Sequence, residues 1–313
     1  MNAKITAIGS YLPDKKLTND DFLYLDTSDE WIRQRTGIET RHIANDTENA
    51  SDIAIKVAND ILKKAPITAK EIDGIVIATA THHQAIPSIA SIVADHLEAE
   101  EVYTLDINAA CSGFIYGMQL AQALVPSQCK HLLLIGVDTM SKIVDWQDRA
   151  SCILFGDGGA GVLISASDKQ GIQAVRCLGD GSGKKYLYTN GDRWQNKACH
   201  VQMQGKEVFR WAVTKQAKVT KELLDKYNIS LDSIDWCIPH QANKRLISSL
   251  LDNMQIALDK AIITVHKHAN TSAASIPLAW CDAVENNKVK RGQRLLLQAF
   301  GAGFTWGAAI IDY

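Results

Sequence analysis

Three polar residues in apolar surroundings have the types and positions needed for thioester chemistry. Cys111 stands in residues 106–114 (DINAACSGF), where a strand-like run gives way to a helix-like one. His240 follows an apolar strand-like run, and Asn270 opens a later helix-like stretch. A thiol, an imidazole and a carboxamide at the ends of buried strands are suited to acyl-thioester chemistry if the fold brings them together.

Cys111 has the sequence context of a nucleophile. Small residues surround it and leave room for an incoming carbonyl, and Gly113 permits a tight strand-to-helix corner. The helix N-terminus that follows offers partial positive charge and free N–H groups. We therefore expect a lowered thiol pKa and a place for an oxyanion. The alternative is a buried structural thiol, the usual state of a cysteine in a core.

His240 and Asn270 each have a structural and a functional interpretation. His240 is flanked by Gln241 and Asn243 just past an apolar strand, where the sites of α/β proteins collect. The alternative is an ordinary surface or core histidine. Asn270 is either an N-cap or a neutral donor to a thioester carbonyl.

Two glycine-rich turns have different meanings. Residues 300–303 (FGAG) form either a plain hairpin turn or a backbone that approaches a ligand and donates an oxyanion N–H. Residues 156–159 (GDGG) are a poor dinucleotide-binding turn, because a strand pattern follows them and not a helix. A phosphate-binding loop of the Gly-x-x-x-x-Gly-Lys-Ser/Thr type is absent from the sequence.

Composition excludes several classes of protein. The chain has 313 residues, 46% of them apolar, and a net charge of −2, so it has material for a large core and no overall attraction to nucleic acid or membrane. It begins without a signal peptide and contains no bilayer-length apolar run. Seven cysteines, none in a Cys-x-x-Cys pair, predict reduced thiols in a cytoplasmic protein without a zinc site.

Hydrophobic patterning predicts an α/β fold. Buried strands are expected at residues 72–79, 102–106, 132–137, 261–265 and 295–300. Amphipathic helices are expected at residues 52–64, 86–97, 113–124, 207–227 and 274–286. Residues 177–204, rich in Gly, Lys, Asn and aromatic side chains, are expected to be loop.

The order of these elements also indicates an internal repeat. In each half a strand leads to a polar helix start, then a further strand, then a glycine-rich turn into a last strand; residues 72–75 (IDGI) are echoed by 234–237 (IDWC). We therefore predict two similar halves, residues 1–168 and 169–313, with Cys111 and Asn270 at equivalent positions facing each other across a pseudo-twofold axis. The alternative is that α/β strands simply resemble one another.

Longer motifs carry a resemblance to a known family. The motifs are residues 5–13 (ITAIGSYLP), 26–32 (DTSDEWI), 35–38 (RTGI), 106–114, 239–243 (PHQAN), 270–275 (NTSAAS) and 304–307 (FTWG). Together they make the chain resemble, over essentially its whole length, the type III β-ketoacyl-acyl-carrier-protein synthases of the thiolase superfamily. The resemblance implies a five-layered αβαβα fold of two similar halves and a homodimer.

The resemblance implies a catalytic triad of Cys111, His240 and Asn270. Cys111 would take the acyl group of an acyl-CoA primer, with the oxyanion on the backbone N–H groups of Cys111 and Ala302. His240 and Asn270 would then stabilise the enolate formed when malonyl-acyl carrier protein loses carbon dioxide. Two neutral donors suit this step, because a carboxylate would repel the enolate. The product would be a 3-oxoacyl-carrier protein that initiates type II fatty-acid biosynthesis, with no metal or other cofactor.

The resemblance also implies binding residues. Contacts to CoA would come from Trp31, Arg35, Arg149, Phe209, Asn243 and Arg245. The acyl pocket would include Ile86 and Phe300, and an acidic carrier protein would dock on Lys206, Arg210, Lys215, Lys244 and Arg245. The lysines have an alternative interpretation as an ordinary solvated helix face.

The sequence departs from the family pattern at the acyl pocket. Ile86 stands where an aromatic residue commonly caps the pocket across the dimer interface, which leaves medium-chain and branched primers open. Two other functions also stay open. One is an acyltransferase of a specialised pathway with an unusual primer, with or without decarboxylation, and the other is a non-catalytic subunit that binds CoA or a carrier protein.

Overall fold

Two large sheets form the framework of the computed structural model, which describes residues 1–191 and 199–313. The first sheet has the order β1-β7-β6-β4-β5 and the second the order β11-β12-β13-β8. The strands of the first are β1 (Asn2–Tyr11), β4 (Gly74–Ala78), β5 (Tyr103–Ile107), β6 (His131–Thr139) and β7 (Asp157–Ser167). Those of the second are β8 (Ile172–Gly179), β11 (Trp236–Pro239), β12 (Arg294–Gly301) and β13 (Thr305–Asp312).

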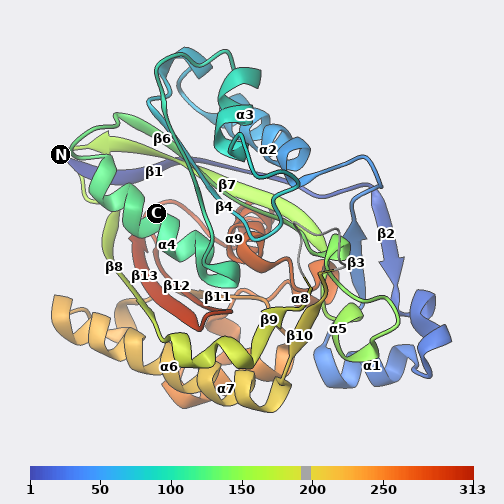
Figure 1. Cartoon of the computed structure of the whole chain (residues 1–313). Helices are drawn as coiled ribbons and strands as arrows, with labels where there is room; N and C mark the ends of the chain where they lie inside the picture. Colours follow the sequence, from blue (N-terminus) through green and yellow to red (C-terminus); the bar gives the residue numbers. More distant parts are fainter. Residues whose placement is uncertain (192–198) are drawn as a thin grey trace.

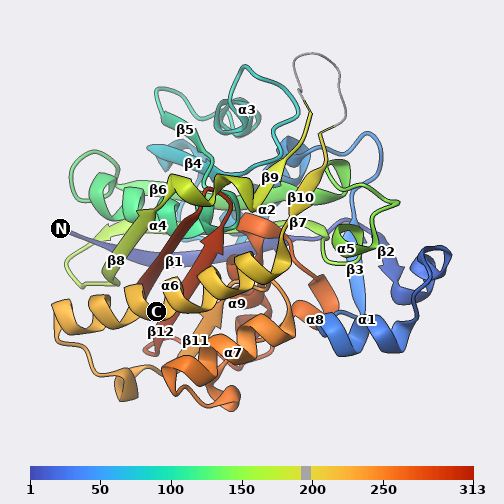
Figure 2. The same cartoon turned by 60° about the horizontal axis from the view of Figure 1, so that its bottom comes forward.

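Helices cover both sheets and fill the space between them (Figure 1, Figure 2). The outer face of the first sheet is covered by α2 (Ala50–Lys64) and α3 (Ile89–His96). Between the sheets lie α4 (Gly113–Leu124) and α9 (Ser275–Glu285), and α9 is buried over most of its length. The outer face of the second sheet is covered by α6 (Gly205–Tyr227) and α7 (Lys244–Met254). The predicted αβαβα layering is confirmed.

Shorter elements complete the described chain. They are β2 (Lys15–Thr18), η1 (Asn19–Leu25), α1 (Asp29–Thr36), β3 (Thr40–Ile43), η2 (Ala69–Glu71), η3 (Ala110–Ser112), η4 (Met140–Lys142), α5 (Arg149–Cys152), η5 (Gly181–Lys185), β9 (Leu187–Thr189), β10 (Val201–Met203), η7 (Leu231–Ser233), η8 (Leu258–Lys260), α8 (Val265–His268) and η9 (Ser272–Ala274). None of the described helices is long and apolar enough to cross a membrane.

The two halves repeat one topology down to single hydrogen bonds. In the first, the Asp73 amide donates to His131 O, and the His131 amide donates to Asp73 Oδ2 at 2.8 Å. In the second, the Asp235 amide donates to Arg294 O, and the Arg294 amide donates to Asp235 Oδ2 at 2.7 Å. All strands of the first large sheet precede residue 168, and all strands of the second follow it. The division into units at 168/169 remains a prediction.

The same turn opens the central helix of each half. In the first, Asn108 Oδ1 accepts the amide of Ala110 at 3.1 Å, and Ala110 has a left-handed φ of 47°. In the second, Asn270 Oδ1 accepts the amide of Ser272 at 2.9 Å, and Ser272 has a left-handed φ of 52°. An Asn side chain that bonds the backbone two residues on is a stable way to make such a turn.

The turns correct one prediction about the repeat. Because η3 and η9 are equivalent, Asn270 corresponds to Asn108 and Cys111 corresponds to Ala273. The prediction that Cys111 and Asn270 are equivalent is therefore wrong. Sequence order suggested it because both residues precede a central helix, whereas the side chain-to-backbone bonds show the register.

Two predicted elements differ in the structure. Residues 261–265 form no strand; Ala261 makes only an isolated bridge to Cys237, at the position β5 occupies in the first half, before α8 begins. Residues 177–204 are not simply loop, since β9 and β10 pair as an antiparallel hairpin there. Residues 192–198 of that stretch lie outside the described part. The other predicted strands and helices are confirmed within a few residues.

A glycine in β6 lets the two halves approach closely. A Cβ on Gly136 would lie 2.4 Å from the carbonyl oxygen of Ala273, in the turn that follows Asn270. The Gly136→Ala variant should therefore lose about 2 kcal/mol of unfolding free energy in urea titration, since overpacking typically costs about 1–3 kcal/mol. Gly205→Ala is the matched control, because a Cβ there meets nothing within 4 Å. Equal stability of the two variants would contradict the close approach.

Candidate active site

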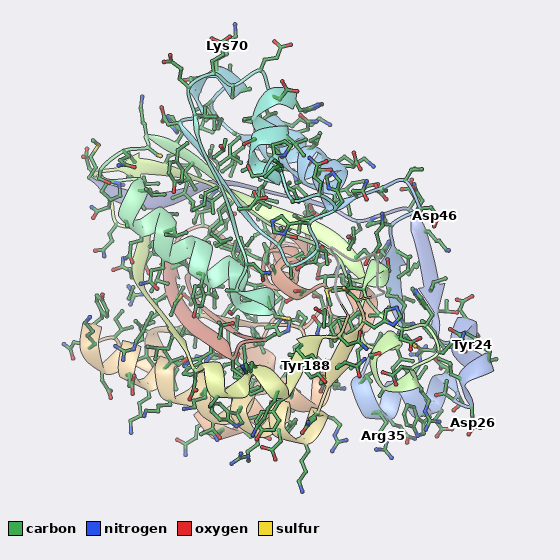
Figure 3. All side chains as sticks on the ribbon, viewed as in Figure 1. Tyr24, Asp26, Arg35, Asp46, Lys70 and Tyr188 are labelled. Carbon is green, nitrogen blue, oxygen red and sulfur yellow. The ribbon has the colours of Figure 1, made fainter. Side chains whose placement is uncertain are left out.

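A cavity of about 280 Å³ lies where the two halves meet. Cys111 from the first half and His240 and Asn270 from the second all line it. Tyr188, which is labelled in Figure 3, also lines the cavity and is 48% exposed. The structure therefore brings the three predicted residues to one small cavity, as their chemistry requires.

Cys111 lies in η3, directly before the N-terminus of α4. Burial raises the pKa of its thiol to about 12; a hydrogen bond with Ser272 lowers this pKa and the charge of Asp138 raises it. The prediction of a lowered thiol pKa is therefore wrong, because removal from water outweighs the helix N-terminus. Cys111 is a neutral thiol at physiological pH.

The backbone amide of Cys111 is kept accessible by a glycine of the other half. A Cβ on Gly301 would lie only 2.8 Å from Cys111 N, so a larger residue would cover this amide. His131 and Arg294 accept the matched backbone bonds of the two halves, and seven residues further along lie Asp138 and Gly301, which are therefore equivalent. Asp138 Oδ2 accepts the amide of Ala273 at 3.1 Å. Ala273 is the counterpart of Cys111. The Ala273 amide is thus bonded by a carboxylate, whereas the equivalent Cys111 amide lies beside a glycine that has no side chain to cover it. Ala302 also lines the cavity.

His240 is held by its backbone and by one ring nitrogen. Its amide donates to Gln298 O at 2.7 Å, and its Nδ1 lies 2.6 Å from Ser275 Oγ. Nε2 is thereby left available to the cavity. Only 5% of the residue is exposed, and burial lowers the pKa of the imidazole to about 4. His240 is therefore neutral at physiological pH.

Asn270 is held in place so that its side-chain NH₂ is oriented away from the bond that its Oδ1 accepts. Its amide donates to Leu154 O at 2.9 Å, and its carbonyl accepts from Gly156 N at 3.1 Å. Its Oδ1 accepts the Ser272 amide, which leaves the side-chain NH₂ for a ligand. The N-cap alternative is wrong, since the N-cap residue of α9 is Ala274.

Gln241 ties the strand that carries His240 to the segment leading to Asn270. Its Nε2 donates to Pro239 O at 2.6 Å and to Ile262 O at 3.2 Å, and its Oε1 accepts the Thr264 amide at 2.8 Å. From the sequence alone Gln241 was named only as a neighbour of His240, and Ser272 and Ser275 only as members of the 270–275 motif. Asp138 was not singled out, although a polar residue at the end of a strongly apolar run was the available signal.

The predicted CoA residues fall into three groups. Trp31 lies beneath two guanidinium groups, with Arg35 Cζ at 5.3 Å and Arg149 Cζ at 4.9 Å from its ring centroid, on the side of the molecule where Arg35 and Asp26 are labelled in Figure 3. Phe209 and Asn243 line the cavity itself. Arg245 lies apart from both, in a surface groove between α1 and α7.

The two acyl-pocket predictions are placed differently. Phe300 lines the cavity. Ile86 is not among the residues that line the cavity of its own chain and is 85% exposed. The sequence expectation was that it reaches a pocket across a dimer interface, and this stays a prediction.

The predicted docking cations gather around two helix starts. Lys206 and Arg210 lie in the first two turns of α6, and Lys244 and Arg245 in the first turn of α7, beside the cavity-lining residues of both helices. Lys215 differs, because its Nζ lies 4.9 Å from the Trp211 ring centroid and also near Trp306. Within the described ranges no cluster of three or more His, Cys, Asp or Glu side chains has the arrangement of a metal site.

This fold and site define a condensing enzyme of the thiolase fold, an acyltransferase. Family models described as 3-oxoacyl-[acyl-carrier-protein] synthase III match residues 105–181 and, as its C-terminal part, residues 224–313. A beta-ketoacyl-[acyl-carrier-protein] synthase III of Wolbachia pipientis is 44% identical over 99% of this chain and 98% of its own, and one of Xylella fastidiosa is 42% identical with the same coverage. The chain belongs to the β-ketoacyl-[acyl-carrier-protein] synthase III family.

Solved structures agree with this assignment. The 3-oxoacyl-[acyl-carrier-protein] synthase III of Aquifex aeolicus has a TM-score of 0.94 at 40% identity, covering 99% of this chain and 100% of that one. The enzyme of Pseudomonas aeruginosa has a TM-score of 0.95 at 33% identity, covering 100% and 98%. The chain is accordingly an acyltransferase of fatty-acid biosynthesis that makes a 3-oxoacyl thioester by decarboxylative condensation.

The buried imidazole of His240 should make stability depend on pH. Its pKa of about 4 in the fold lies below the ordinary 6.5, so between pH 6.5 and 4 the unfolded chain binds a proton that the folded chain does not. The free energy of unfolding should therefore decrease as the pH is lowered through this window. The decrease should be steeper in wild type than in His240→Gln, by about 1.4 kcal/mol per pH unit. Urea titrations of both proteins between pH 7 and 4.5 measure the difference. Parallel pH profiles would show that His240 is not buried in its neutral form.

Proposed function

We propose that Cys111, His240 and Asn270 catalyse transfer of an acyl group from acyl-CoA and its condensation with malonyl-acyl carrier protein. The observation that carries this proposal is the single cavity that all three line, with a thiol from one half and two neutral donors from the other. His240 is uncharged and the Asn270 carboxamide has a free NH₂, which suits stabilisation of a negative charge that forms only during the reaction.

In the first half-reaction the Cys111 sulfur attacks the thioester carbonyl. The neutral thiol gives its proton to His240 Nε2 as the C–S bond forms, and the backbone amides of Cys111 and Ala302 hold the oxyanion. The CoA sulfur then leaves and takes up that proton, which returns His240 to its neutral form. The Ser275 hydroxyl beside Nδ1 can donate or accept, so it suits either neutral tautomer.

In the second half-reaction the malonyl thioester loses carbon dioxide. The electrons of the broken C–C bond pass to the thioester oxygen, where Asn270 and His240, the latter now as the neutral tautomer protonated at Nε2, donate hydrogen bonds. The resulting carbon nucleophile attacks the acyl group on Cys111. The sulfur leaves as thiolate and takes a proton from solution, which restores the starting site and releases the 3-oxoacyl-carrier protein.

The substrate-binding roles are part of the same proposal. Phe209 and Asn243 would line the path of the pantetheine arm, and Trp31 with Arg35 and Arg149 would hold the adenine and phosphate groups. The cations at the starts of α6 and α7 flank the cavity, which suits docking of an acidic carrier protein. A homodimer would bring Ile86, now exposed, to a partner surface. A cytoplasmic location would suit the thiols of the described chain.

The primer is the one feature for which a second candidate has support. A saturated chain is suited by the largely apolar lining, which includes Ile143, Leu154, Leu187, Val201, Met203, Val208 and Leu246. The priming β-ketosynthase of the R1128 polyketide pathway has a TM-score of 0.95 at 29% identity over 99% of this chain, so a specialised condensing role with an unusual primer is the second candidate.

Acyl transfer can be tested by intact-mass analysis after incubation with a panel of acyl-CoAs of different length and branching. Wild type should gain the mass of one acyl group, and Cys111→Ala should gain none. Cys129→Ala, which removes a buried thiol remote from the cavity, is the control and should be acylated like wild type. Adducts on Cys111→Ala would contradict the nucleophile assignment. An adduct that malonyl-carrier protein cannot discharge would favour non-decarboxylative transfer.

Variants of the two donor residues should affect different half-reactions. Asn270→Asp keeps the oxygen that accepts the Ser272 amide but removes the NH₂ donor, so it should accept the acyl group and slow decarboxylation by roughly 10²–10³-fold. His240→Ala should slow both steps, because it removes the proton acceptor as well as a donor. Radiolabelled carbon dioxide release and acyl-adduct mass report the two steps separately. Normal decarboxylation by Asn270→Asp would remove the proposed role of the carboxamide.

A further inference from the structure

A buried carboxylate beneath the cavity has no role in the reaction described so far. Asp138 is 0% exposed, and its Oδ1 accepts from the Ala80 amide at 2.8 Å and from the hydroxyls of Thr79 at 3.0 Å and Thr81 at 2.8 Å. Its Oδ2 accepts the Ala273 amide, and the Ser272 hydroxyl lies near the carboxylate. Among the described residues only neutral donors and no cation contact this charge, an arrangement that is costly to bury and so calls for an explanation.

Ser272 connects this carboxylate to the reaction centre. The residue is 2% exposed and lines the cavity. Its side chain lies close enough to the Asp138 carboxylate and to the Cys111 sulfur for its hydroxyl to interact with either, while its amide donates to Asn270 Oδ1 at 2.9 Å. One residue therefore contacts the nucleophile, the carboxamide donor and the buried charge.

The internal repeat shows that neither group is needed for the turn itself. The position equivalent to Ser272 in the first half is Ala110, which has the same left-handed φ and no hydroxyl. The position equivalent to Asp138 is Gly301, which has no side chain. Ser272 and Asp138, which have no polar counterparts in the other half, thus lie next to each other near Cys111.

We propose that Ser272 is a positioning residue of this site: its hydroxyl joins the Cys111 sulfur to the Asp138 carboxylate while its amide fixes the Asn270 carboxamide. The carboxylate can only accept, so in the resting site the serine donates to Asp138 and accepts from the Cys111 S–H. When the sulfur is a thiolate, one hydroxyl hydrogen has two anionic acceptors. Asp138 thus favours the thiol, and Ser272 supplies the donor to sulfur when it becomes anionic.

This inference rests on the proposed nucleophile, so its test includes a readout that needs no acyl transfer. That readout is the rate at which iodoacetamide alkylates Cys111 at pH 8.5, followed on the Cys111 peptide by mass spectrometry. Well below the thiol pKa this rate follows the thiolate fraction, and one pKa unit is a tenfold change. Decarboxylation of malonyl thioester is measured on the same proteins.

The expected results are opposite for the two partners. Ser272→Ala removes the donor to sulfur and should slow alkylation several-fold. Asp138→Asn removes the charge, and its NH₂ can donate to Ser272 Oγ and free the hydroxyl for sulfur, so alkylation should quicken up to about tenfold. Simple loosening of the site would instead quicken alkylation in both variants. Ser165→Ala, a buried hydroxyl in β7 far from the cavity, is the control and should match wild type.

The Ser272→Gly variant distinguishes loss of the hydroxyl from strain in the backbone. Glycine adopts a φ of 52° without strain, so it should fold at least as well as alanine there but still lack the hydroxyl. Both variants should alkylate slowly, whereas malonyl decarboxylation should stay near the wild-type rate, because both keep the backbone amide that fixes Asn270. Wild-type alkylation in both variants, or full recovery of alkylation in Ser272→Gly alone, would overturn the proposal. Failure of wild type to accept any acyl group would refute the proposed function while leaving the alkylation comparison valid.

Discussion

The site depends on the contact between a strand end of one half and a helix start of the other. Strand β6 ends at the turn that follows Asn270, and strand β12 ends at the turn that carries Cys111. Both approaches are close enough that a glycine is required at each, Gly136 in one case and Gly301 in the other. Because each half supports the reactive turn of its neighbour, the thiol and the two donors keep their positions only while the halves are packed together.

Burial shapes the chemistry of this site more than local charge does. The same removal from water raises the pKa of Cys111 to about 12 and lowers that of His240 to about 4. A cysteine–histidine ion pair is therefore disfavoured at rest, and both groups are neutral when substrate arrives. Such a site suits a reaction whose negative charge appears on the substrate, since neutral donors in a mostly apolar cavity stabilise that charge without first attracting a competing anion.

Much of this could be predicted from sequence because the signals were local. Alternating apolar runs located the strands, and the polar groups at their ends located Cys111, His240 and Asn270. The pKa of Cys111 could not be predicted, since it depends on how completely distant segments exclude water. The register of the repeat was also missed, because it is fixed by bonds such as those of Asn108 and Asn270 to the amides two residues on.

Asp138 and Gly301 occupy equivalent positions in the two halves. The difference between them decides which of the two equivalent turns has an uncovered backbone amide. The amide of Ala273 is covered by a carboxylate, whereas its counterpart on Cys111 faces open space left by a missing side chain. Under the proposed mechanism the first half supplies the thiol and the second half the two neutral donors of one shared centre. Each polypeptide would then have a single catalytic turn despite two versions of the motif that could house it.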